Sequence, residues 1–210
     1  YGTVTGVQTC ALPISDQFGT FSGETPRTDS PEEALQKKCL YAMEQTGADL
    51  AIASEGSFGP HPQLFFVPAN EEWLLLIDKK NNLQWKAKKI STLTNFSGQL
   101  IHSVEALKSF ASAAQFPEHA LILRNADNGK IEIVKGIHDL NVLIKNFERM
   151  QAVYGAVFVE TDMRAMHNPL RMQVIAETAQ LLVEKLLRLC PSCQTDRKST
   201  RLNSSHSSVS

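Results

Sequence analysis

The sequence predicts an α/β fold, a single domain in which helices flank a mixed β-sheet. Segments with the apolar spacing of helices alternate with short apolar runs typical of strands. Two pairs of these runs are joined by residues 79–82 and 127–129, whose Asn and Gly residues are typical of β-hairpin turns. About 180 native residues can bury the core that one such domain needs.

Both ends of the chain are predicted to be translated sequencing adapter. One DNA segment can encode VTGVQTCALPI at residues 4–14 and, on its complementary strand, DRKSTRLNSSH at residues 196–206. Chance does not explain two unrelated peptides sharing one DNA segment, so both are excluded from the argument about fold. The expected division is adapter at 1–14, the α/β domain at 15–189, the start of a truncated Cys-x-x-Cys zinc module at 190–195, and adapter at 196–210.

Composition limits the classes of partner. Without Arg197, Lys198, Arg201 and Asp196, the formal net charge moves from −1 to about −3. A mildly acidic chain without a basic stripe predicts no nucleic-acid partner. The apolar runs are too short to span a bilayer, so no membrane association is expected. The few cysteines favour a reducing, cytoplasmic location. Oligomeric state stays open.

The first helix is predicted from its caps. Ser30 is a preferred N-cap, Pro31 suits the first helical position and Glu33 completes a capping box. The helix should end near Thr46, because Gly47 is a preferred residue just beyond a helix.

The remaining elements follow from apolar spacing and turn residues. In chain order they are a strand at 49–54, a brief pairing at 64–67, a hairpin of strands at 72–78 and 83–90, a polar loop at 91–98, a helix at 103–115, a strand at 120–124 paired with 130–135, a helix at 138–153, a strand at 156–160, and a helix from Pro169 to about Arg188 with Ile175, Ala179, Leu182, Val183 and Leu186 on its apolar face.

Three polar loops, at residues 16–27, 54–62 and 161–171, are the candidates for chemistry. Two of them follow apolar strands, and ligands of open α/β sheets bind beyond the carboxyl ends of strands. The candidate side chains are Asp16, Glu24 and Arg27 in the first loop, Glu55, Ser57 and His61 in the second, and Asp162, Arg164, His167, Asn168 and Arg171 in the third.

The carboxylates in these loops suit a hard cation. Glu55 with Asp16 or Glu24 is expected to hold Mg²⁺, which takes one or two carboxylates together with water and ligand phosphates. Asp162 is a further candidate catalytic carboxylate. For any one loop, the alternative is a connection whose polar groups satisfy its own backbone.

The arginines suit a phosphate. Arg164 and Arg171 flank the helix start at Asn168, where guanidinium groups and backbone N–H groups both bind anions. The structural alternatives are a local ion pair between Asp162 and Arg164, a helix cap at Asn168, and a surface position for Arg171.

The cysteines divide into two kinds. Cys190 and Cys193 form half of a tetrahedral zinc site, and alone they are not expected to hold zinc tightly. Cys39 is expected to be a buried structural thiol. His119 and His138 are expected to be ordinary surface residues.

Five segments together carry a family resemblance. DQFGTFSGETPR, ASEGSFGPHP, the pair Thr94-Asn95, TDMRAMHNPLRM and CPSC resemble an uncharacterised bacterial family of domains of unknown function, of the 6671 type. The resemblance covers nearly all of residues 15–195 and implies that Thr94 and Asn95 belong with the ligand-binding set. It also implies a Cys-rich, zinc-ribbon-like tail, and hence Zn²⁺, in the full-length protein. The family brings no established activity.

The order of elements has a second resemblance. It is similar to that of house-cleaning nucleoside triphosphate pyrophosphatases of the inosine triphosphatase type. That resemblance implies a Mg²⁺-binding carboxylate at a strand end, which is Glu55 here.

Two functions are therefore carried forward. The first is a metal-dependent hydrolase of a phosphorylated small molecule or nucleotide, in which Arg164 and Arg171 bind phosphate and a metal-bound water attacks. The alternative is a non-enzymatic ligand- or protein-binding domain with a zinc-ribbon tail.

Overall fold

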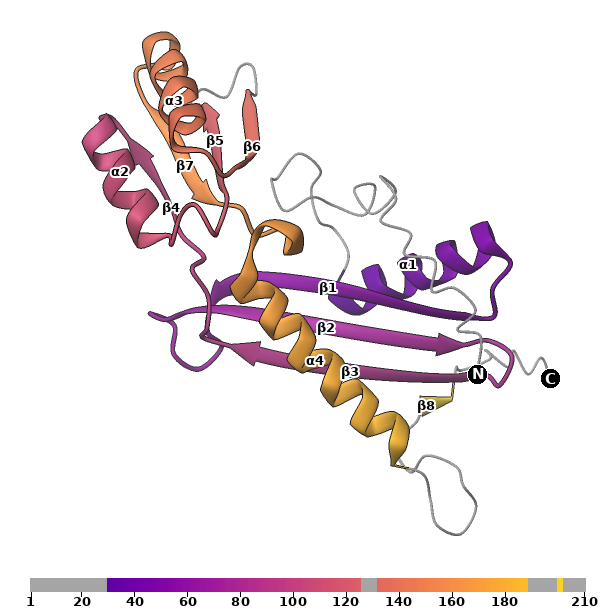
Figure 1. The fold of residues 1–210 in the computed structure, drawn as a ribbon. Coiled ribbons are helices and arrows are strands. Elements are labelled where there is room, and N and C mark those ends of the chain that lie inside the picture. Colours follow the sequence, from indigo (N-terminus) through magenta and orange to yellow (C-terminus); the bar gives the residue numbers. More distant parts are fainter. Residues whose placement is uncertain (1–29, 126–131, 189–199, 202–210) are drawn as a thin grey trace, which may run out of the picture. The chain divides into compact units, whose positions relative to one another are not determined.

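The computed structural model describes residues 30–125, 132–188 and 200–201, and it confirms the α/β class (Figure 1). The elements are α1 (Pro31–Thr46), β1 (Leu50–Pro60), β2 (Pro68–Asp78), β3 (Leu83–Ser91), β4 (Gly98–Ile101), α2 (Val104–Ala113), β5 (Leu121–Asn125), β6 (Ile133–Ile137), α3 (Leu140–Tyr154), β7 (Val157–Thr161), the 3-10 helix η2 (Ala165–His167), α4 (Pro169–Leu187) and β8 (Thr200–Arg201).

The strands form two sheets, with strand orders β1-β2-β3-β8 and β4-β7-β5-β6. The contacts also divide the chain into two compact units. Unit 1 takes the described residues up to Gly56, Trp73–Lys88 and those from Thr178 onward, and unit 2 takes Ser57–Glu72 and Lys89–Glu177. The boundary falls inside β1, β2, β3 and α4, so each unit is described by itself.

The capping signals of α1 act as the sequence predicts. Ser30 Oγ accepts from Glu33 N at 3.3 Å, and Glu33 Oε2 accepts from Ser30 N at 2.8 Å. Gly47 ends the helix in the left-handed conformation, with φ 68°. Both ends of the helix are therefore set by residues within one turn of them.

Replacing Gly47 by alanine is expected to lower the free energy of unfolding by about 1 kcal/mol, because a Cβ disfavours the left-handed conformation. Gly59→Ala is the matched control, since Gly59 has no positive φ and no atom lies within 4 Å of a Cβ built there. Urea unfolding measures both. Equal losses in the two variants would contradict a conformational role for Gly47.

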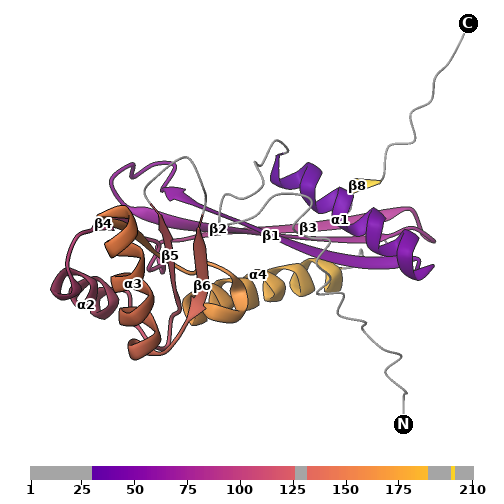
Figure 2. The ribbon, with the colours of Figure 1, turned by 90° about the horizontal axis from the view of Figure 1, so that it is seen from above.

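Alternate residues of β2 and β3 in unit 1 face different helices. Leu75 packs with Cys39 of α1 in one cluster, whereas Leu74 and Ala87 pack with Leu182 of α4 in another. Successive side chains of a strand point to opposite faces. Within unit 1, α1 and the end of α4 therefore cover opposite faces of the sheet (Figure 2).

Cys39 is the buried structural thiol that was expected. Its side chain is fully buried, and its Sγ lies 3.6 Å from the carbonyl oxygen of Leu75. Burial raises the pKa of this thiol to about 12, and the nearby Lys38 opposes that rise. A thiol that stays protonated is a poor nucleophile and metal ligand, so Cys39 has a packing role.

The predicted loop at residues 54–62 is wrong, because β1 continues to Pro60. Neither Gly56 nor Gly59 has a positive φ. An edge strand tolerates glycine and a terminal proline, and β1 lies at the edge of its sheet. His61 N donates to Val67 O at 2.8 Å, so residues 61–67 connect β1 to β2 and do not pair as expected.

The hairpin between β2 and β3 is confirmed. Asn82 takes a left-handed conformation with φ 54°, as its place in the turn predicts. Asp78 Oδ1 accepts from Asn81 N at 3.0 Å, and this hydrogen bond fixes the turn.

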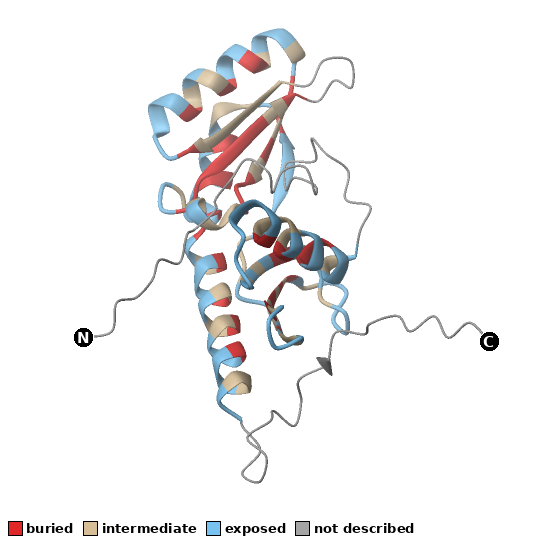
Figure 3. Cartoon of the chain, turned by 90° about the vertical axis from the view of Figure 1, so that its right-hand side faces the viewer, coloured by how far each residue is buried: buried red, intermediate tan, exposed pale blue. Residues whose placement is uncertain are grey.

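The buried stripe of α4 differs from the expected one. Val174, Thr178 and Leu182 are buried, whereas Val183 is 50% exposed. The helix begins at Pro169, as predicted, and Figure 3 shows its buried residues on one side. Its apolar face is thus displaced by about one residue from the predicted face.

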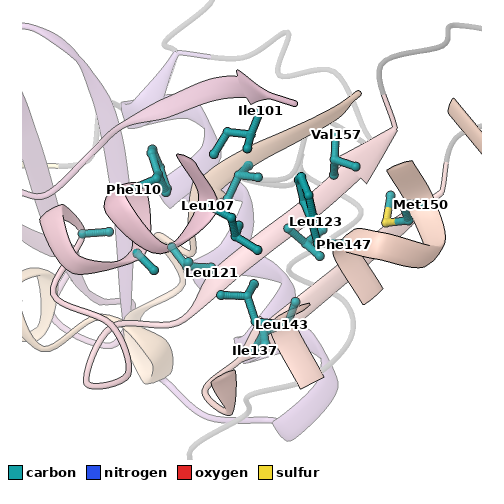
Figure 4. Packing of buried hydrophobic residues seen from close by; sticks show 13 residues of the cluster. Ile101, Leu107, Phe110, Leu121, Leu123, Ile137, Leu143, Phe147, Met150 and Val157 are labelled. Atoms are coloured by element: carbon teal, nitrogen blue, oxygen red, sulfur yellow. The ribbon is translucent and has the colours of Figure 1, made fainter. Parts of the chain in front are cut away.

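Unit 2 has its own sheet and core. All of its strand pairs, β4 with β7, β5 with β6 and β5 with β7, are antiparallel. Leu121 and Leu123 of β5 pack with Phe147 of α3 and Leu107 of α2 (Figure 4). The strand β4 was not predicted, because residues 98–101 follow a polar loop without a turn signal. The predicted turn at 127–129 lies outside the described residues.

The strand order of unit 2 positions its loops. Both β6 and β7 run antiparallel to β5 and lie on either side of it. They are therefore parallel to each other, and both end at the edge of the sheet where β5 begins.

Among the described residues, no helix is long and apolar enough to cross a membrane.

Candidate functional site

Asp162 is the centre of a polar cluster at the ends of β6 and β7. We call Gly136, His138, Asp162, Arg164 and His167 the Asp162 cluster. The carboxylate is fully buried. Its Oδ2 accepts from Gly136 N at 3.1 Å and from Arg164 Nη2 at 2.6 Å, and its Oδ1 accepts from Arg164 Nε at 2.9 Å and N at 3.1 Å. Asp162 thus orients Arg164, as the ion-pair alternative anticipated.

Gly136 allows the side chains of Arg164 and His167 to lie close to the backbone of β6. It has φ 68°, and the pairing of β5 with β6 shifts register beside it, as at a β-bulge. A Cβ built on Gly136 would lie 3.1 Å from His167 Nε2 and 3.2 Å from Arg164 Nη2. Both side chains approach the backbone here only because the residue is glycine.

Two histidines of the cluster are hydrogen-bonded to each other. His138 Nε2 lies 3.0 Å from His167 Nδ1, and His138 Nδ1 lies 2.8 Å from Pro117 O. A carbonyl only accepts, so His138 donates from Nδ1. When both rings are neutral, its Nε2 accepts from His167 Nδ1, and His167 Nε2 then has no proton.

The surroundings of His167 favour its neutral form. Burial is the main cause that lowers its pKa from 6.5, with contributions from Arg164 and His138, while Asp162 opposes the shift. His167 Nε2 can therefore accept a proton near neutral pH.

The sequence interpretation missed two members of this cluster. His138 was expected to be an ordinary surface residue, and Gly136 was not singled out. An isolated glycine in a strand is typical of a bulge, and Gly136 is such a glycine, two residues before a histidine.

Arg171 lies in the interior of unit 2 and not at the surface. Its Nε donates to Glu72 Oε1 at 2.7 Å, its Nη1 donates to Met163 O at 2.6 Å, and the side chains of the ion pair are 6% and 1% exposed. The guanidinium also lies 5.3 Å from the ring of Phe58. These contacts support a structural role, and phosphate binding by Arg171 stays a prediction.

Asn95 and Asn168 link α2 to α4. Asn168 Oδ1 caps α4 by accepting from Arg171 N at 3.0 Å, and its Nδ2 donates to Asn95 Oδ1 at 2.9 Å. Asn95 Nδ2 donates to Ala114 O at 2.8 Å. Thr94 accepts from Phe96 N at 3.1 Å, a local turn contact. The structure thus brings Asn95 and Asn168 together. The contacts that they and Thr94 make are structural.

The candidates from residues 54–62 make local contacts. Glu55 is buried in unit 1 and its Oε2 is ion-paired with Lys38 of α1. His61 belongs to unit 2, and its Nδ1 accepts from the backbone N–H groups of Gln63 and Leu64 at 3.2 Å each. Ser57 is exposed on β1.

Of the residues expected to hold Mg²⁺, Glu55 lies within the described residues, where it is ion-paired with Lys38. Within the described ranges, no group of three or more His, Cys, Asp or Glu residues is placed to hold a metal ion. The other predicted residues, Asp16, Glu24, Arg27, Cys190 and Cys193, lie outside the described residues.

Comparison with known proteins gives one match. The sequence model of a domain of unknown function, DUF6671, matches residues 38–204. The match begins after the segment at residues 16–27 and extends past Asp196. No curated protein and no solved structure gives a significant match.

Proposed function

This chain belongs to the DUF6671 family, and from that premise we propose that it binds a phosphate-bearing small molecule at the Asp162 cluster. The observation that carries the proposal is that Arg164 is both held in place and partly exposed. Its guanidinium is oriented by a fully buried carboxylate, while its side chain keeps 35% exposure. Asp162 takes the Nε–Nη2 edge of the guanidinium, and we propose that a phosphate accepts from its Nη1–Nη2 end, with little side-chain entropy left to lose.

The histidines add to this site. His138 is exposed and His167 is half-buried, and both lie in the cluster that contains Arg164. Protonation of His167 adds positive charge next to the guanidinium. Because the pKa of His167 lies below 6.5, that charge is gained as the pH falls below this value. Phosphate binding is therefore expected to tighten in mild acid.

Hydrolysis of the bound ligand is the second candidate function. It is favoured by the neutral His167, whose Nε2 can accept a proton from an attacking water. Mg²⁺ at Glu55, Asp16 and Glu24 stays a proposal, as does Zn²⁺ at Cys190 and Cys193. A binding domain without catalysis needs neither metal.

Calorimetric titration with inorganic phosphate and pyrophosphate at pH 7.5 and 6.0 tests the binding proposal. Arg164→Gln should weaken binding at least about tenfold, the order expected for a charge-assisted contact. Arg188→Gln is the matched control, because that side chain is 63% exposed. We expect it to bind like the parent chain. Equal affinities for the two variants would refute the proposal.

The same preparations, incubated with Mg²⁺ and a panel of nucleoside triphosphates, separate the two candidates. Release of phosphate or pyrophosphate that His167→Asn abolishes supports a hydrolase. Binding without any release by the folded chain would contradict hydrolysis and leave the binding function standing.

A further inference from the structure

One face of the unit 2 sheet carries polar and aromatic side chains that lead to the Asp162 cluster. Val159 of β7 packs with α2 and α3 in the core of unit 2. Successive side chains of a strand point to opposite faces, so Phe158 and Glu160 lie on the face away from these helices. Asp162 follows in the same alternation, because its N donates to Ala120 O at 2.9 Å and continues the pairing of β7 with β5.

Arg124 of β5 lies on this face as well. It is paired with Phe158 in the register of β5 with β7, and its guanidinium carbon lies 4.4 Å from the centre of the Phe158 ring. Its Nη2 lies 3.5 Å from Glu160 Oε2. The ring and the carboxylate together hold the guanidinium in place. The side chain of Arg124 nevertheless keeps 38% exposure, so it shares with Arg164 the property of being both held and partly exposed.

Gly98 of β4 makes room for the ring of Phe158. Gly98 is paired with Glu160 in the register of β4 with β7. A Cβ built on Gly98 would lie 2.9 Å from Cε1 and Cζ of Phe158 and 3.2 Å from Cβ of Glu160. A larger residue at this position would therefore displace the ring against which Arg124 lies.

The ion pair of Arg124 leaves donors for a further anion. Its contact with Glu160 is long for a hydrogen bond. Burial is the main cause that raises the pKa of Glu160; Arg124 opposes the rise and Asp162 adds to it. A carboxyl group that is harder to ionise neutralises its guanidinium less. The Nε of Arg124 is buried, so a ligand can reach only the two terminal nitrogens.

The two arginines are anchored at separate points of the same face. Glu160 contacts Arg124, and Asp162 contacts Arg164. The two acidic residues are two positions apart, which places their backbones about 7 Å apart along the strand. A ligand whose two phosphates are separated by a carbon skeleton matches two such anchors better than pyrophosphate, whose phosphates share one oxygen.

We infer that the ligand of the Asp162 cluster is a small molecule with two separated phosphate groups, one bound by Arg164 and the other by Arg124. This inference rests on the proposed phosphate binding and names the class of its ligand. Once the first phosphate is bound, the second is held close to Arg124 at a high effective concentration. A ligand with two phosphates should therefore bind more tightly than its monophosphate counterpart.

Calorimetric titration of the full chain with fructose 1,6-bisphosphate and fructose 6-phosphate at pH 7.5 tests this inference. The bisphosphate should bind at least about tenfold more tightly, the order expected for one more charge-assisted contact. Arg124→Gln should remove this advantage and leave the affinity for fructose 6-phosphate unchanged. Arg149→Gln is the matched control, because that arginine is also ion-paired and is 50% exposed, but lies on α3. It should bind both sugar phosphates like the parent chain.

A second variant covers a failure of Arg124→Gln to fold. Arg124→Lys keeps the charge but loses the fork of N–H donors, so the advantage of the bisphosphate should fall several-fold. A parent-like advantage in the folded Arg124 variants would refute the second phosphate contact.

Arg164→Gln separates this inference from the proposed function. It should weaken the binding of both sugar phosphates. If binding of fructose 6-phosphate depends on Arg164 while the bisphosphate binds no more tightly, the ligand class is wrong and the proposed function stands. If Arg164→Gln changes the affinity for neither sugar phosphate, the proposed function is overturned, and this inference with it.

Discussion

Replacing Arg171 by methionine is expected to lower the free energy of unfolding by about 3–5 kcal/mol, the cost of removing one partner of a buried ion pair. The substitution leaves the buried carboxylate of Glu72 without the guanidinium that lies 2.7 Å from it. It also removes the donor to Met163 O. Urea unfolding monitored by circular dichroism measures the loss.

A double-mutant cycle separates the ion pair from packing. Glu72→Leu combined with Arg171→Met should recover much of the lost stability. Two apolar side chains of similar size leave no unpaired charge in the interior. Arg188→Met is the matched control at an exposed position and should change stability by less than about 0.5 kcal/mol. Additive losses at residues 72 and 171 would show that the two side chains are not coupled.

Replacing Asp162 by asparagine is expected to cause the second large loss in the free energy of unfolding. Asparagine keeps the size of the side chain but offers one acceptor oxygen where Gly136 N, Arg164 N and the guanidinium now share two. We expect a loss of about 1.5–3 kcal/mol, the range for hydrogen bonds to a charged group. Arg164 loses its orientation, so phosphate binding should fall with it.

The same substitution should also change the pKa values of neighbouring groups. Asp162 raises the pKa of His167 and that of Glu160, so removing its charge should lower both pKa values. Because the pKa of His167 is already below that of an unfolded histidine, a further decrease makes stability fall more steeply as the pH drops below 6.5. NMR titration of His167 and unfolding at pH 7.5 and 5.5 check these signs. Asp49→Asn, at an exposed position, should change neither.

Local signals predicted most helices and hairpins of this protein. The capping box at Ser30 and Gly47 placed both ends of α1, and Asn168 and Pro169 placed the start of α4. These signals act between residues within one turn of each other, so they are legible in the chain itself.

The candidate site was predicted only in part. Asp162, Arg164 and His167 are close in sequence, and they do form a cluster. His138 and Gly136 join them because β6 and β7 end at the same edge of the unit 2 sheet, an arrangement that depends on strand order. Glu55 was expected in a loop, and pairing with β2 keeps it in a strand.

By itself, the sequence determined the α/β class, the helix caps, the hairpin turn at residues 79–82 and the polar segment around Asp162. Only the tertiary structure decided that the strands divide into two sheets, that Arg171 is buried against Glu72, and that His138 reaches His167. The reason is physical. Caps and turns depend on hydrogen bonds between near neighbours, whereas strand order, burial and side-chain pairing depend on residues far apart along the chain.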